Sequence, residues 1–134
     1  MAHIAVMQPL YHPPISEVTV QGLLHALSDP VRVQIFSDLL RAHLALNCTN
    51  LMCKLGMDLP KSSLSQHFKV LRESGLIRSE RKGVELQNTT RWKELEKDFG
   101  PMIKEIISAY ANKNAAMTTQ NRRGRQTGQS AKSG

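Results

Sequence analysis

The sequence predicts a mainly α-helical domain that carries one small β-hairpin. Apolar residues recur with helical spacing in four stretches ahead of the hairpin and in one stretch after it. Two short segments with strand-like alternation, 76–80 and 84–87, enclose Arg81, Lys82 and Gly83. The chain has 134 residues, which suits one domain and leaves no room for two full ones. The predicted order of elements is therefore α-α-α-α-β-β-α.

The first two helices are predicted to meet at the tripeptide Ser28-Asp29-Pro30. The first helix is expected to begin at Ser16, and its apolar side consists of Val20, Leu23, Leu24 and Leu27. Asp29 is expected to cap the second helix, and Pro30 fits its first helical position. A short third helix is predicted over residues 50–56.

The fourth helix is predicted to begin at Leu59-Pro60 and to end at Ser74, where Gly75 stops it. Its apolar arc consists of Leu64, Phe68 and Leu71, and its opposite side consists of Ser62, Ser65, Gln66 and Lys69. Short polar side chains allow a helix backbone to approach a flat polar partner closely. The third and fourth helices, joined by residues 56–59, therefore read as a helix-turn-helix.

The hairpin and the last helix complete the fold. Gly83 supplies a position that tolerates a positive φ, so the hairpin has a basic tip at its turn. Thr89 or Thr90 is expected to cap the last helix, and Gly100-Pro101 is expected to interrupt it. The second half of this helix carries an apolar stripe, formed by Met102, Ile103, Ile106, Ile107 and Tyr110.

The net charge of +7 is concentrated in two blocks. Residues 60–93 and residues 112–134 each carry a net charge of +5, and the remaining segments are slightly acidic. The block at 112–134 has almost no large apolar residues, which predicts a basic disordered tail. Residues 1–15 include three prolines between positions 9 and 14, which predicts an extended or disordered arm. The folded domain is therefore expected over residues 16–111.

Several protein classes do not fit this composition. No apolar run approaches the roughly 18 residues that a membrane span needs. Two cysteines are too few for a disulfide-stapled secreted protein, and the first 14 residues do not resemble a signal peptide, so we expect a cytoplasmic protein. We expect no enzymatic activity and no cofactor, because the sequence has no glycine-rich phosphate loop and no arrangement of nucleophile and base.

Two segments carry a family resemblance. Residues 23–32 (LLHALSDPVR) and residues 62–77 (SSLSQHFKVLRESGLI) resemble the most recognisable stretches of the ArsR/SmtB family of bacterial winged helix-turn-helix repressors. The resemblance covers about residues 18–110. It implies a homodimer that is built from the first and last helices and binds an imperfect inverted repeat in DNA. It also places Ser62, Ser63, Ser65, Gln66 and His67 at the DNA-facing start of the recognition helix.

These considerations predict two sets of site residues. We expect DNA to be contacted by Lys61, Ser62, Ser63, Ser65, Gln66, His67, Lys69, Arg72, Arg78, Arg81 and Lys82. We expect the dimer interface to include Val20, Leu23, Leu24, Met102, Ile103, Ile106, Ile107 and Tyr110. His67 lies at the edge of the apolar arc, so it also fits a packed or capping histidine.

No metal site is expected. Many members of the family sense metals through a Cys-x-Cys pair, but Cys48 and Cys53 are five residues apart and would lie about 140° apart on a helix. Other members bind zinc through aspartate and histidine pairs in the last helices, and residues 90–111 contain no histidine. Cys53 fits a small core residue. Cys48 is the candidate for a thiol switch, because a nearby helix N-terminus favours the thiolate.

Two other functions remain open at this point. A nonspecific architectural DNA-binding protein would use the same basic blocks, with a larger part for the tail. A protein-binding adaptor with weak DNA readout would use the exposed last helix. The polar face of the fourth helix also fits an ordinary solvated surface, and the tail fits a solubilising end. The hairpin and the local charge of +5 over residues 60–93 favour sequence-specific DNA binding.

Overall fold

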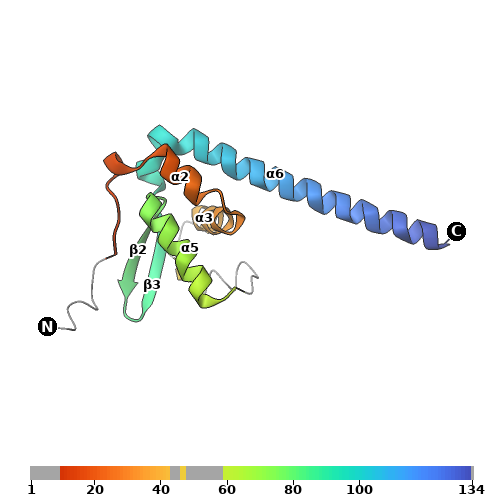
Figure 1. Ribbon diagram of the computed structural model, residues 1–134, viewed down its shortest axis with the longest axis horizontal. Helices are drawn as coiled ribbons and strands as arrows, with labels where there is room; N and C mark the ends of the chain where they lie inside the picture. The colour runs from red at the N-terminus through yellow and green to blue at the C-terminus, as the bar shows by residue number, and fades with distance from the viewer. Residues whose placement is uncertain (1–9, 43–45, 48–58, 134) are drawn as a thin grey trace. The chain divides into compact units, whose positions relative to one another are not determined.

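A computed structural model describes residues 10–42, 46–47 and 59–133, with side chains described for 10–42 and 59–114 (Figure 1). The elements are η1 (Ile15–Glu17), α2 (Val20–Ala26), α3 (Pro30–Ala42), β1 (Leu46–Asn47), α5 (Lys61–Ser74), β2 (Ile77–Lys82), β3 (Glu85–Thr90) and α6 (Trp92–Ser133). The mainly helical fold with a β-hairpin is confirmed. The chain divides into two compact units, Met1–Gly100 and Pro101–Gly134, which are described separately. The third helix predicted at 50–56 lies outside the described residues.

The junction between α2 and α3 follows the local signals in part. The α-helix begins at Val20 rather than Ser16, because Thr19 caps it by accepting a 3.0 Å hydrogen bond from the Gly22 amide, and residues 15–17 form a single 3₁₀ turn. The predicted cap of α3 is confirmed. Asp29 Oδ1 accepts the Val31 amide at 2.8 Å, and Pro30 is the first residue of the helix.

The end of α5 is confirmed at Ser74. Gly75 adopts a left-handed conformation with φ of 95° and directs its amide to the Arg72 carbonyl at 3.1 Å. The Leu76 amide reaches back to the Leu71 carbonyl at 3.0 Å, which completes a Schellman motif. This motif reverses the chain sharply, so that only two residues separate the end of α5 from the start of β2, which contacts the helix.

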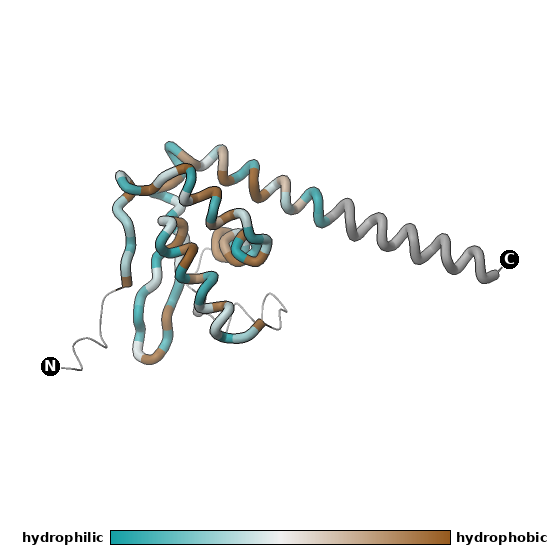
Figure 2. The backbone as a smooth tube through the Cα atoms, in the orientation of Figure 1, coloured by the Kyte–Doolittle hydropathy of each residue, from teal (hydrophilic) through white to brown (hydrophobic). Residues whose placement is uncertain are grey.

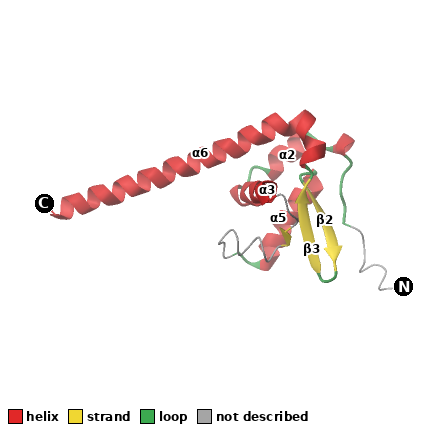
Figure 3. Cartoon of the chain, turned by 180° about the vertical axis from the view of Figure 1, so that it is seen from behind, coloured by secondary structure: helices red, strands yellow, loops and turns green. Residues whose placement is uncertain are grey.

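A three-stranded antiparallel sheet follows, in the order β1-β3-β2 (Figure 3). The hairpin ladder runs from Ile77 opposite Thr90 to Lys82 opposite Glu85, and Gly83 in the turn has φ of 66° as predicted. The hairpin is longer than its alternation indicated, because the ladder continues through residues 88–90. Thr90 is therefore a strand residue, and the expectation that Thr89 or Thr90 caps the last helix is wrong: the helix begins after Arg91.

The core of the first unit is formed by apolar faces of the helices and of β2. Leu23, Phe36, Leu64, Leu71, Leu76, Ile77 and Leu95 are almost completely buried. Brown and teal alternate along α5 in Figure 2, which reflects its apolar and polar sides. Leu23 is therefore a core residue, whereas Val20 is 44% and Leu24 is 47% exposed. Of the three α2 residues that were expected at a dimer interface, only these two remain at the surface of the chain.

The last helix departs from prediction in two respects. It runs without a break through Gly100 and Pro101, so the predicted interruption is wrong. A proline removes one backbone hydrogen bond but leaves the helical backbone on both sides intact here. The helix also continues to Ser133, across residues 112–133 for which composition indicated a disordered tail. This segment includes alanine, glutamine, arginine and lysine residues, which are good helix formers.

Candidate nucleic-acid interface

The exposed side of α5 presents the predicted recognition surface. Leu64, Phe68 and Leu71 are buried, which fixes the opposite side of the helix toward solvent. The exposed side chains on this helix include Lys61, Ser62, Ser63, Ser65, Gln66 and Lys69. A shallow hollow is lined by Ser62, Ser63, Gln66 and His67. Short hydroxyl side chains around a hollow let a flat polar surface approach the helix closely, and Gln66 supplies both a donor and an acceptor.

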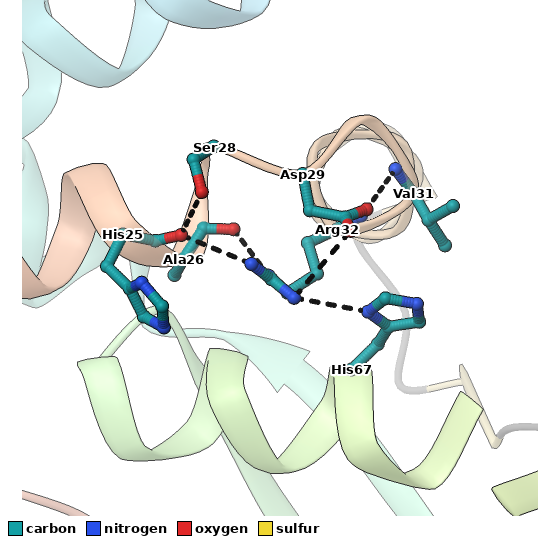
Figure 4. Close-up of polar contacts among 7 residues, drawn as sticks. All are labelled: His25, Ala26, Ser28, Asp29, Val31, Arg32 and His67. Atoms are coloured by element: carbon teal, nitrogen blue, oxygen red, sulfur yellow. Dashed lines mark hydrogen bonds and ion pairs between the residues drawn. The ribbon is translucent and has the colours of Figure 1, made fainter. Parts of the chain in front are cut away.

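His67 is held by an arginine that also fixes the α2–α3 junction (Figure 4). Arg32 Nε donates to the Ala26 carbonyl at 2.7 Å, and its Nη2 donates to the His25 carbonyl at 3.2 Å. Its Nη1 lies 3.3 Å from His67 Nδ1. Because a guanidinium only donates, His67 Nδ1 is the acceptor in this contact. His67 thus connects α5 to the helix junction, which favours the packed role over a direct base contact.

The hairpin supplies a second basic surface. Arg81 and Lys82 are exposed at its tip, and the neighbouring Val84 is fully exposed. Arg78 lies on β2 and forms a 3.7 Å ion pair with Glu94 Oε2. Of the cations predicted at the hairpin, Arg81 and Lys82 therefore fit a DNA contact best.

A chain of hydrogen bonds connects α5 to the hairpin. Arg72 Nη1 donates to Ser79 Oγ at 3.1 Å, and Ser79 Oγ donates to Asn88 Oδ1 at 2.6 Å. Ser79 and Asn88 are buried and lie opposite each other in the ladder. Arg72, which was expected to contact DNA, is half-buried and fixes the position of the hairpin relative to α5. The sequence carried no signal for this pair, because buried polar partners do not alter hydrophobic periodicity.

The N-terminal arm contacts β2 and Arg91, and sequence reasoning missed both contacts. His12 Nε2 accepts the Ser79 amide at 3.0 Å on the outer edge of β2. The Pro13 carbonyl accepts a 2.6 Å hydrogen bond from Arg91 Nη1. Burial and then the positive charges of Arg78, Arg72 and Arg91 lower the pKa of His12. The arm therefore covers an open strand edge that would otherwise expose an unpaired amide.

This contact predicts a pH-dependent stability. The pKa of His12 is lower in the folded chain than its ordinary value of about 6.5, so the unfolded state binds the proton more readily. The stability that His12 contributes is complete above about pH 6.5 and is lost as the pH falls below that value. The variant His12→Gln keeps an acceptor that does not titrate. Urea unfolding at pH 7.5 and pH 5.5 should show a smaller loss for this variant, and equal losses would contradict the prediction.

The remaining predicted residues divide as follows. Ile103 is completely buried, whereas Met102, Ile106, Ile107 and Tyr110 on α6 are partly exposed.

Cys48 lies outside the described residues, so the structure does not bear on a thiol switch. Among the described residues, no group of three or more metal-ligating side chains occurs. No helix in the described part of the chain is both long and apolar enough to cross a membrane.

Comparisons with known proteins agree with this geometry. A helix-turn-helix domain family matches residues 27–80, which include α3, α5 and the start of β2. An ArsR-like transcriptional regulator from Rhodococcus sp. RHA1 has a similar structure, with a TM-score of 0.50 and 21% sequence identity, covering 74% of this chain and 89% of its own. The crystal structure of an ArsR family transcriptional regulator also has a TM-score of 0.50, with 17% identity and coverage of 81% and 97%.

No curated protein matches the chain significantly. The matched family, the two similar structures and the arrangement of α5 beside a β-hairpin are consistent with one another. The chain is therefore a winged helix-turn-helix protein with the fold of the ArsR-type transcriptional regulators.

Proposed function

We propose that this protein is a DNA-binding transcriptional regulator and that it acts as a homodimeric repressor on an imperfect inverted repeat. The observation that carries the proposal is the exposed polar side of α5, where Ser62, Ser65 and Gln66 lie beside a hairpin with a basic tip. In this arrangement α5 enters the major groove, and the hairpin is the wing. A dimer bound at a promoter would occupy that DNA and so block transcription.

The exposed side chains divide into those that would contact base edges and those that would contact phosphates. Gln66 has the donor and acceptor needed for two hydrogen bonds to an adenine edge, and the serines tolerate several bases. Lys61 and Lys69 on α5 and Arg81 on the wing supply charge to phosphates, which sets affinity and orientation without reading sequence. Arg72 and His67 are positioning residues, since both are engaged within the chain.

A dimer would place two recognition helices in successive major grooves, about 34 Å apart. The exposed Val20 and Leu24 on α2, together with the partly exposed residues of the α6 stripe, are the apolar side chains we assign to the two-fold interface. Exposed apolar residues at i and i+4 on a helix form a continuous strip that water disfavours.

The test is selection of duplexes from a random pool, followed by fluorescence anisotropy at two salt concentrations. Enrichment of an inverted repeat, bound with a Kd on the order of 10⁻⁸ M and at least about 10³-fold over scrambled DNA, would support a specific dimeric regulator. Salt-sensitive micromolar binding without enrichment would instead support an architectural protein. Absence of binding at low salt would contradict both and would favour an adaptor.

Two variants of α5 should distinguish base contacts, which determine sequence preference, from phosphate contacts, which do not. Gln66→Ala is expected to weaken the selected site by about tenfold and to relax selection at one base position, since a bidentate contact discriminates by about 1–3 kcal/mol. Lys69→Ala should weaken all sequences alike and reduce the salt slope by about one. Lys97→Ala, an exposed lysine on α6, is the control and should change neither quantity. Equal behaviour of Gln66→Ala and Lys69→Ala would contradict this assignment.

A further inference from the structure

A pocket with a volume of about 490 Å³ opens beside the start of α6. It is lined by Leu39 and Leu40 of α3, Arg78 of β2, Thr89 and Thr90 at the end of β3, and residues 91–94. Its volume lies within the range of about 300–1,000 Å³ that is typical of small-molecule sites. Arg78 is the only lining residue that the sequence assigned to DNA contact, so the pocket is largely separate from the recognition surface.

Positively charged side chains outnumber negatively charged ones in the pocket lining. It is lined by three cations, Arg78, Arg91 and Lys93, and by one carboxylate, Glu94. Arg91 already satisfies that carboxylate through two hydrogen bonds of 2.7 and 2.9 Å. Arg78 reaches the same carboxylate only at 3.7 Å and is 45% exposed. The remaining positive charge at the pocket is therefore carried by Arg78 and Lys93, which suits an anion.

The rest of the lining is suited to an apolar body. Leu39 is buried and Leu40 is partly buried, and both belong to the last turns of α3. Trp92 also lines the pocket, and the threonine hydroxyls add neutral hydrogen-bonding groups. An inorganic anion would leave these apolar walls unfilled, and a neutral hydrocarbon would leave the cations without a partner.

We propose that this pocket binds a small organic anion, a carboxylate with an aromatic body, whose charged end is held by Arg78 and Lys93. The ring lies against Leu39 and Leu40. The carboxylate competes with Glu94 for Arg78, so occupancy changes the partner of a residue in the wing. Binding itself does not depend on the proposed function, because it is measured without DNA.

The test uses 3-phenylpropionate as the probe and the full chain without DNA. Isothermal titration calorimetry should show saturable binding of one molecule per chain with a Kd on the order of 10⁻⁴ M or tighter. Trp92 is the only tryptophan in the chain and lines the pocket, so its fluorescence should change with the same Kd. The neutral analogue 3-phenylpropanamide, of the same size, should bind at least about tenfold more weakly.

A matched pair of lysines on α6 locates the site. Lys93→Ala should weaken 3-phenylpropionate at least about fivefold, whereas Lys97→Ala, one turn along the helix and outside the pocket, should not change its affinity. Both side chains are exposed, so neither change should affect folding. The proposal is wrong if the probe does not saturate, if the amide binds equally well, or if the two lysine variants behave alike. Binding of inorganic phosphate as tight as that of the probe would also overturn it.

Discussion

Replacement of Gly75 by alanine is expected to lower the free energy of unfolding by about 3 kcal/mol, because strain and overpacking add at this position. Gly75 has φ of 95°, which a residue with a Cβ adopts only at a cost. A Cβ at this position would lie 2.5 Å from Cγ2 of Val18, well inside contact distance. Val18 is buried and β-branched, so it has little freedom to move away.

Gly83→Ala is the matched control for this prediction. Gly83 also has a positive φ, of 66°, but nothing lies within 4 Å of a Cβ placed there. It should therefore lose only the conformational part, about 1 kcal/mol. Urea unfolding of both variants measures the difference, and Val18→Ala combined with Gly75→Ala should recover part of the loss. Equal destabilisation by the two alanines would show that the contact with Val18 has no role.

The elements that sequence reasoning placed correctly are those with local signals. Asp29 and Pro30 mark the start of α3 within two adjacent positions, and Gly75 marks the end of α5. In each case the residues that determine the boundary lie within one helical turn of it. The apolar arc of α5 is equally local, since Leu64, Phe68 and Leu71 recur at helical spacing. The exposure of the polar side of α5 followed directly from that arc.

The features that sequence reasoning missed depend on partners distant in the chain. His12 and Ser79 are 67 residues apart, and Pro13 and Arg91 are 78 residues apart. Strand β1 has only two residues, too few to show alternation. Periodicity placed Leu23 and Leu24 on the same side of α2, but packing buries one and leaves the other exposed. A hydrophobic pattern identifies a face, and only the tertiary fold decides which members of that face reach the surface.

The wing is held from three directions, and this bears on how the two basic surfaces act together. Arg72 connects β2 to α5, His12 of the arm covers the outer edge of β2, and Arg91 connects the arm to the base of α6. Ser79 takes part in the first two of these contacts. A wing held in this way keeps Arg81 and Lys82 at a defined distance from the exposed side of α5. On the proposed function, contact of both surfaces with DNA at once would then cost less conformational entropy.

Arg91→Met is expected to lower the free energy of unfolding by about 3 kcal/mol, because it breaks charge-assisted hydrogen bonds and leaves a buried carbonyl without a donor. The Arg91 side chain is only 2% exposed, and it donates to both Glu94 and the Pro13 carbonyl. Arg78→Met removes a second arginine from the same carboxylate, but that pair is longer and its two side chains are 45% and 39% exposed, so about 1 kcal/mol or less is expected. The two variants remove the same formal charge, so the difference in their expected destabilisation comes from the deeper burial of Arg91.

Urea unfolding at pH 7 and pH 3.5 measures both effects. The hydrogen bond from Arg91, more than any other contact, holds the pKa of Glu94 below its usual range. The stability that Glu94 contributes is therefore present above about pH 4.5 and is lost as the pH falls through its lowered pKa. The difference between the native protein and Arg91→Met should accordingly shrink at pH 3.5 but not vanish, because the hydrogen bond to Pro13 does not titrate. If Arg78→Met were as destabilising as Arg91→Met, the arm would not be anchored through the buried arginine.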